Sequence, residues 1–154
     1  MKNKFIFSVT FIICVFNLVQ AYSDTIKISS KLVNVYRENS VSVFSGQVYA
    51  EDNEIKLWSD KLSVYYDESK NSVYKIIAEE NVKIIAEGVT AYGNYSEYQI
   101  DNEELLLEGN VAVIENDNQI LSDQLILDLA KSTSIMTAKT NNRVKAQISK
   151  TNNE

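Results

Sequence analysis

Residues that could carry acid, base or nucleophilic chemistry are scarce in this chain. The sequence contains no His, and its one Cys, Cys14, lies in an apolar N-terminal run. The usual general base, zinc ligands and thiol nucleophile are therefore missing. Glu79-Glu80 and Glu103-Glu104 have the residue type that glycoside hydrolysis uses, but each pair lies in a polar stretch typical of a turn. The sequence predicts no enzyme, and no catalytic, metal or cofactor site.

The N-terminal residues are typical of a secretory signal peptide. Lys2 and Lys4 precede an apolar run over 5–19, and Val19-Gln20-Ala21 places small residues where a signal peptidase reads, so cleavage is expected after Ala21. The run has about fifteen residues, fewer than the roughly 20 that a membrane-spanning helix needs. A retained membrane anchor is the alternative.

Removal of that leader makes the protein strongly acidic. The whole chain has 15 basic and 21 acidic residues, and without the two leader lysines the net charge is −8. A nucleic-acid partner is not expected, because such proteins present a basic stripe. The expected division is a cleaved signal peptide over 1–21, one β domain over 22–149 and a polar tail over 150–154, in an exported protein.

Apolar and polar residues alternate along the chain, which is the pattern of strands with one buried face. No helical periodicity extends over ten residues after the leader, no Pro occurs, and clusters of Asn, Asp, Glu, Ser and Gly separate the segments. About eleven short antiparallel strands are expected, over 26–29, 32–36, 41–50, 54–66, 73–78, 82–86, 90–100, 104–114, 119–129, 134–139 and 143–148.

The strands belong to a repeat. Gly46, Val48 and Ser59-Asp60 recur sixty-three positions later as Gly109, Val111 and Ser122-Asp123. Valines at 48, 82, 111 and 144 are about thirty residues apart, a spacing of repeat architectures. The predicted fold is therefore all-β and antiparallel, built from repeated strand units.

One apolar face continues through every unit. Its members are Ile26, Ile28, Phe44, Val48, Ile55, Leu57, Leu62, Val64, Ile84, Ile100, Leu105, Leu107, Val111, Ile120, Leu125 and Leu127. This face is consistent with a sandwich core closed on itself, and equally with two sheets splayed enough to admit an apolar ligand. Periodicity does not separate the two.

The order of these segments resembles the OstA-like family of periplasmic lipopolysaccharide-transport bridge proteins. The resemblance begins at Ile26 to Ser30, continues through residues 41–48 and 55–62, and recurs at Leu107-Glu108-Gly109-Asn110-Val111 and at residues 121–125. It implies a twisted, V-shaped β-jellyroll that shelters the acyl chains of lipid A. It also implies head-to-tail assembly between an inner-membrane ABC transporter complex and an outer-membrane lipopolysaccharide assembly protein.

Two sets of functional residues are predicted. The resemblance implies lipid contacts at Ile26, Ile28, Ile84 and Ile100, and the apolar face adds Phe44, Leu57 and Leu107. Self-association is expected at the two terminal edges, through Ile26, Ile28, Val144, Ala146 and Ile148, because unblocked strand edges pair with other chains. Two alternatives remain: the inner-membrane-anchored component of the same pathway, and a structural β-repeat polymer with a dry core.

Overall fold

The computed structural model describes residues 25–52 and 55–149. The predicted signal peptide and the predicted polar tail lie outside these described residues. Within the described part of the chain, no helix is long and apolar enough to cross a membrane. Its regular structure consists of ten β-strands and one short 3-10 helix, Arg37–Asn39.

The strands form a single antiparallel sheet. In chain order they are β1 (Lys27–Ser29), β2 (Leu32–Tyr36), β3 (Val41–Glu51), β4 (Ile55–Asp67), β5 (Ser72–Ala86), β6 (Val89–Gln99), β7 (Glu104–Glu115), β8 (Asn118–Asp128), β9 (Thr133–Thr137) and β10 (Lys145–Gln147). From β3 to β8 each strand pairs with the next one along the chain. The predicted all-β antiparallel fold is confirmed.

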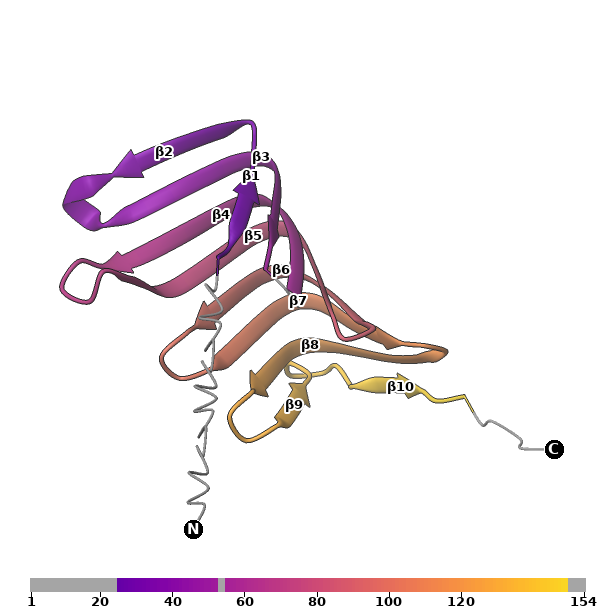
Figure 1. Cartoon of the computed structure of the whole chain (residues 1–154). Helices are drawn as coiled ribbons and strands as arrows, with labels where there is room; N and C mark the ends of the chain where they lie inside the picture. Colours follow the sequence, from indigo (N-terminus) through magenta and orange to yellow (C-terminus); the bar gives the residue numbers. More distant parts are fainter. Residues whose placement is uncertain (1–24, 53–54, 150–154) are drawn as a thin grey trace, which may run out of the picture.

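The sheet is folded along its middle into two walls. One half of β3 pairs with β2 and the other half pairs with β1. At the opposite end of the sheet, β8 divides in the same way between β9 and β10. We call the half bounded by β2 and β9 the first wall, and the half bounded by β1 and β10 the second wall. Figure 1 shows the long strands bending together at their middles, which gives the predicted V-shaped jellyroll.

The bend lies where two residues of one strand oppose a single residue of the next. Gly46-Gln47 in β3 and Gly109-Asn110 in β7 have positive φ, and the pairing is shifted at both places. Glu80-Asn81 repeats this arrangement in β5. Such bulges bend a strand and increase its local twist. Because the three bulges lie at the same level, they fold the whole sheet along one line.

The bulge in β5 corrects the predicted number of strands. The sequence predicts two strands, over 73–78 and 82–86, because Glu79, Glu80 and Asn81 interrupt the alternation. The structure instead contains one strand through both segments. Glu80 and Asn81 form a bulge rather than a turn, so the chain continues in the same direction. The described residues therefore contain ten strands where eleven were expected.

Acids on the outer side of the corner hold the following segment in place. Asp60 accepts a hydrogen bond from Asn81 Nδ2 at 2.6 Å, which joins β4 to the bulge of β5. Asp123 accepts from the backbone N–H of Lys139 at 2.7 Å and from Asn142 Nδ2 at 3.0 and 2.9 Å. The segment that crosses from β9 to β10 is thus fixed to the corner by one carboxylate.

The core lies on the inner face along the corner. Val48, Val82 and Val111 each follow a bulge, and each is only 1% exposed. Val144 has the corresponding place beside β8 but is 41% exposed, because β10 is the last strand of the second wall. The buried apolar residues are Val48, Ala50, Leu62, Val64, Ala78, Val82, Ile84, Leu107, Val111 and Leu125. The valine repeat therefore forms a line across the sheet that ends at an open edge.

Candidate functional site

An apolar groove lies between the two walls, on the inner face of the sheet. Its volume is about 350 Å³. The lining residues are Ile26, Ala50, Glu51, Asp52, Ile55, Leu57, Leu62, Ile76, Ala78, Ile84, Ala86, Glu87, Val89, Ala91, Ser96, Tyr98, Leu105, Leu127 and Leu129. The inner face is thus not packed shut between the two walls. Concave, mostly apolar spaces of this size are the usual form of a small-molecule site.

Short side chains keep the groove open. On the second wall, Ala50, Leu57, Ile84 and Ala91 occupy one row of neighbouring strands, and residues directly opposite each other lie on the same face of a sheet. Alanines thus stand where larger side chains would fill the space between the walls. Interiors are otherwise close-packed, so this gap is a specific feature of the inner face.

Three of the predicted lipid-contacting residues line this groove. Ile26 precedes β1, Leu57 lies in β4 and Ile84 lies in β5. All three belong to the second wall. Ile26 is 38% exposed, whereas Ile84 is 7% exposed, so the groove extends from the buried core out to solvent at the β1 edge.

The other four predicted residues lie elsewhere on the molecule. Ile28 and Phe44 pack against the core on the inner face, and Leu107 is a fully buried member of the core. Ile100 lies in the turn after β6, where its backbone N–H donates to the carbonyl of Tyr74 at 3.0 Å. These four positions do not line the groove.

Sequence reasoning missed several lining residues of the first wall. Ile76, Tyr98 and Leu129 line the groove but were not predicted as contacts. A usable signal exists for Tyr98, because register pairs it with Leu105, a member of the predicted apolar face. The alanines carry no such signal, because an inward Ala is as common in a closed core as beside a space.

Carboxylates gather where the groove meets the turns of the second wall. Glu51, Asp52 and Glu87 are among the lining residues, and no Lys or Arg is among the described residues that line it. Asp52 Oδ1 accepts the backbone N–H of Ile55 at 2.8 Å and so fixes its own turn. Burial raises the pKa of the Tyr98 hydroxyl, and the carboxylates of Glu103 and Asp52 raise this pKa further. Acids from both walls therefore act at the mouth of the groove.

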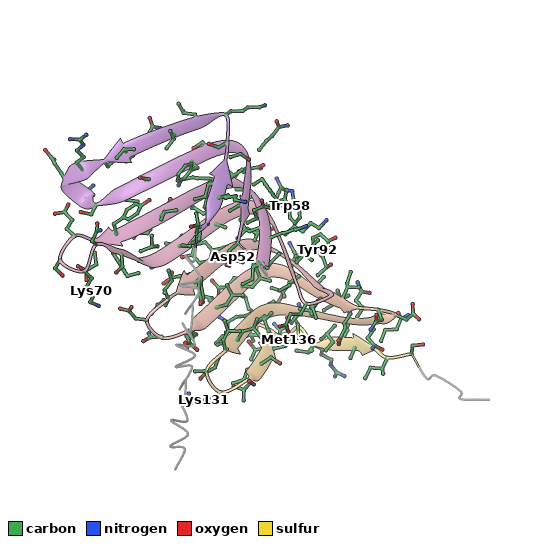
Figure 2. The ribbon with its side chains drawn as sticks, in the orientation of Figure 1. Asp52, Trp58, Lys70, Tyr92, Lys131 and Met136 are labelled. Carbon is green, nitrogen blue, oxygen red and sulfur yellow. The ribbon has the colours of Figure 1, made fainter. Side chains whose placement is uncertain are left out.

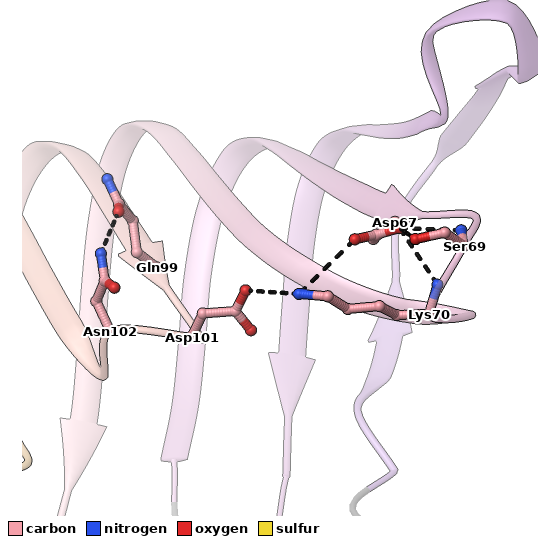
Figure 3. A network of polar contacts seen from close by, with 6 residues as sticks. All are labelled: Asp67, Ser69, Lys70, Gln99, Asp101 and Asn102. Carbon is pink, nitrogen blue, oxygen red and sulfur yellow. Dashed lines mark hydrogen bonds and ion pairs between the residues drawn. The ribbon is translucent and has the colours of Figure 1, made fainter.

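A second hollow, of about 460 Å³, lies on the lip of the first wall and is polar. Two of its lining residues, Asp67 and Asp101, contact the neighbouring Lys70: Figure 3 shows Lys70 Nζ, which lies 3.3 Å from Asp101 and 3.8 Å from Asp67. The hydroxyl of Ser69 donates to Asp67 at 2.6 Å and is the main reason why the pKa of that carboxyl is lowered. These contacts join the β4–β5 turn to the β6–β7 turn. The described residues contain no group of acids that could hold a metal ion.

The outer face of the second wall carries a row of aromatic side chains that contact one another or a lysine between them. The rings of Tyr49 and Trp58 lie 5.1 Å apart, and Lys83 Nζ lies 5.0 Å from the centre of the Trp58 ring and 5.9 Å from that of Tyr92. Figure 2 shows Trp58 and Tyr92 on the same region of the second wall. Such cation–π contacts stabilise a sheet surface, and these side chains do not line the groove.

The two ends of the sheet expose apolar side chains of the inner face. At the β2 end, Val33 and Val35 are 49% and 63% exposed, and register places them opposite the inner-face residues Phe44 and Ser42. At the β10 end, Ala146 pairs with Ile120, and Ile148 is 72% exposed. The inner surface is therefore apolar at both ends of the sheet.

Comparison with known proteins decides what this architecture is. The sequence profile of the LptA/(LptD N-terminal domain) LPS transport protein family matches residues 27–133. The chain belongs to this family. The match begins at the first residue of β1 and ends at the first residue of β9, so it covers both walls of the LptA-type fold. This is a family of transport proteins, which confirms the expectation that the chain is not an enzyme and identifies it as a lipopolysaccharide transport protein.

A solved structure has the same fold. LptH from Pseudomonas aeruginosa, described as the LptA homologous periplasmic component of the conserved lipopolysaccharide transport device, is 14% identical to this chain. The two superpose with a TM-score of 0.72 over 82% of this chain and 96% of that structure. A search of curated protein sequences found no significant match. The low identity means that LptH supports the jellyroll fold, whereas the family profile carries the assignment.

Proposed function

We propose that this LptA-type chain is a periplasmic carrier that shelters the acyl chains of lipid A in the groove between its walls. The observation that carries the proposal is the groove itself, whose lining is aliphatic apart from Tyr98, Ser96 and the carboxylates at the mouth. Each methylene removed from water contributes about 0.8 kcal/mol. One long acyl chain in the groove therefore avoids a cost on the order of 10 kcal/mol.

Head-to-tail assembly would make this groove continuous from one copy to the next. The first wall ends in β2 and β9, which have five residues each, and the second wall ends in β1 and β10, which have three each. Along the meander, β2 and β9 run in opposite directions, as do β1 and β10. The β1–β2 edge of one copy can therefore extend both walls of another in the antiparallel sense.

Such joining is heterologous, and heterologous contacts that do not close form open chains. We place the self-association edges at Ile26 and Ile28 on one end and at Val144, Ala146 and Ile148 on the other. The same edges are offered to an inner-membrane ABC transporter complex and to an outer-membrane assembly protein. No nucleotide site is needed in this chain, because a transfer between similar apolar grooves is nearly isoenergetic.

Location in the periplasm depends on the leader. We propose cleavage after Ala21, which releases a mature chain that begins at Tyr22. The mass of the exported protein tests this directly. A mass that retains residues 1–21 would instead make the chain the membrane-anchored component of the same pathway.

Lipopolysaccharide binding by the delipidated mature protein tests the carrier function. Ile26→Glu places a charge at the groove mouth, and Leu121→Glu is its matched control, because these residues are 38% and 39% exposed and only Ile26 lines the groove. We expect stoichiometric binding by the wild type and a loss of roughly tenfold, about 1.4 kcal/mol, in Ile26→Glu alone. Equal losses in both variants, or no binding by the wild type, would refute the carrier.

A further inference from the structure

Two hydroxyl groups interrupt the aliphatic lining of the groove. Ser96 and Tyr98 both lie in β6, two residues apart, so their side chains leave the strand on the same face, and both line the groove. A strand rises about 3.4 Å per residue, which separates the two side chains by roughly 7 Å along the wall. Ser96 is 3% exposed, whereas Tyr98 is half-buried. The lining therefore has an inner and an outer hydroxyl on one strand.

The strand repeat has aliphatic residues at both of these places. Segments 59–64, 93–98 and 122–127 are corresponding copies of one strand, and the pairing places their equivalent residues in common rows across the sheet. Where β6 has Ser96, the other two copies have leucine, and where it has Tyr98, they have valine or leucine. These aliphatic counterparts are Leu62, Leu125, Val64 and Leu127. The two hydroxyls thus depart from the repeat at positions that line the groove.

The Ser96 hydroxyl has no hydrogen-bond partner among the described residues. Its neighbours across the sheet are Ala78 and Leu107, which are 1% and 0% exposed and have no polar side-chain atom. Ser59 differs, because its hydroxyl donates to the carbonyl oxygen of Lys61 at 3.0 Å. No fully enclosed polar side-chain atom in the described part of the chain lacks a partner, so the Ser96 hydroxyl must open onto the groove that it lines.

This unpaired hydroxyl favours a ligand that has a polar group at the same level. A plain hydrocarbon chain over Ser96 would exclude water from the hydroxyl without replacing the lost hydrogen bond, which weakens binding. A chain with its own hydroxyl there restores the bond, because a hydroxyl both donates and accepts. The Tyr98 hydroxyl likewise has no partner within residues 25–52 and 55–149. Burial raises its pKa, so it stays protonated and can donate to a carbonyl oxygen.

We infer that the groove selects an acyl chain that carries a hydroxyl close to its carboxyl end, with Ser96 binding that hydroxyl and Tyr98 donating to the ester carbonyl. The order follows from burial. Tyr98 is the outer residue and meets the end of the chain beside the head group, whereas Ser96 lies further in. This inference deepens the proposed function and rests on it for lipid A.

Three uncharged esters test the inference with the delipidated mature protein: the dodecanoyl, β-hydroxydodecanoyl and ω-hydroxydodecanoyl esters of maltose. The three share head group, ester and chain length, so their affinities, measured by calorimetry below the micelle-forming concentration, differ only through the hydroxyl. The β-hydroxy ester should bind at least roughly fivefold more tightly than the plain ester. The ω-hydroxy ester, whose hydroxyl is at the far end of the chain, should bind no more tightly than the plain ester.

Variants assign the preference to its residues. Ser96→Ala should bind the plain ester more tightly and the β-hydroxy ester more weakly than the wild type does, so that the preference disappears. Ser63→Ala is the matched control and should keep the preference, because Ser63 is 5% exposed, its hydroxyl is also unpaired among the described residues, and it does not line the groove. Tyr98→Phe should weaken all three esters by a similar factor. Circular dichroism checks that each variant is folded.

The results separate this inference from the proposed function. Equal affinity of the wild type for the plain and β-hydroxy esters would show that water satisfies Ser96, and would overturn the inference. A preference that survives in Ser96→Ala, is lost in Ser63→Ala or is shared by the ω-hydroxy ester also overturns it, as does unchanged binding by Tyr98→Phe or no binding of any ester. If the preference is found but lipopolysaccharide does not bind, the inference stands and the proposed function fails. If lipopolysaccharide binds without the preference, the proposed function stands and the inference fails.

Discussion

The corner of the sheet should be sensitive to a single methyl group at Gly109. This glycine has φ of +80°, and a Cβ built on it would lie 3.0 Å from both Cβ and Nδ2 of Asn94. Gly88 is the matched control, because it has φ of +84° and a Cβ there would meet nothing within 4 Å. The two glycines share the same backbone demand and differ only in their surroundings.

The magnitudes follow from these surroundings. A left-handed φ costs a side-chain-bearing residue about 1–2 kcal/mol, and the smaller entropy of the unfolded chain returns about 0.4–1 kcal/mol. Gly88→Ala should therefore lower the free energy of unfolding by roughly 0.5–1 kcal/mol. Gly109→Ala must also displace Asn94, whose Cβ is fixed by the β6 backbone, which adds about 1–2 kcal/mol.

Urea unfolding measures the difference. With an m-value of about 2 kcal/mol/M, Gly109→Ala should move the midpoint by roughly 0.5–1 M more than Gly88→Ala does. Asn94→Gly in the Gly109→Ala background should recover the added loss, as a coupling free energy between two residues in contact. Equal midpoints for the two single variants would refute the reasoning, because the corner would then tolerate the methyl group.

Three further predictions concern the edge, the polar contacts and the crossover. Ala146→Pro removes a backbone donor from the β10 edge, so light scattering should show concentration-dependent oligomers for the wild type and a monomer for the variant; a wild type that stays monomeric or forms a closed dimer contradicts the edge model. The Tyr95 hydroxyl donates to Glu97 at 2.7 Å and lowers the pKa of that carboxyl, so the unfolded state binds more protons and stability should fall as pH drops through the pKa of folded Glu97; Tyr95→Phe should flatten this fall, and an unchanged acid limb of thermal unfolding would exclude the contribution. Asp123→Ala should speed hydrogen exchange at the Lys139 amide by at least roughly tenfold, while exchange in the β7 core stays unchanged; equal protection in both proteins would show that the crossover does not depend on this carboxylate.

The strands were predictable because their alternation is local. Residues such as Val48 and Ala50 lie on one face of a strand whatever the strand packs against, so the sequence determines which side faces inward. The bend was harder to predict. Gly46 and Gly109 mark two of the bulges, but the third uses Glu80 and Asn81 with φ of 64° and 52°. A carboxylate-amide pair between apolar segments is more typical of a turn, and this is why β5 was expected as two strands.

The groove was predictable only as one of two possible outcomes. Leu105 and Leu107 have the same parity in β7, yet Leu105 lines the groove and Leu107 is fully buried. The difference depends on how far the opposite wall stands from each residue, and three bulges set that distance together. Likewise, the sequence indicates two terminal edges, but only the pairing shows that β2 is as much an edge as β1.

The central claim is that acyl chains of lipopolysaccharide travel along the inner face between the walls. Ala91 and Ala112 are matched reporters on adjacent strands, because both are half-buried alanines and only Ala91 lines the groove. A photoreactive amino acid at each position, irradiated in cells that export the protein, should form a lipopolysaccharide adduct at position 91 and none at position 112. Equal adducts at both positions, or an adduct at position 112 alone, would contradict the account.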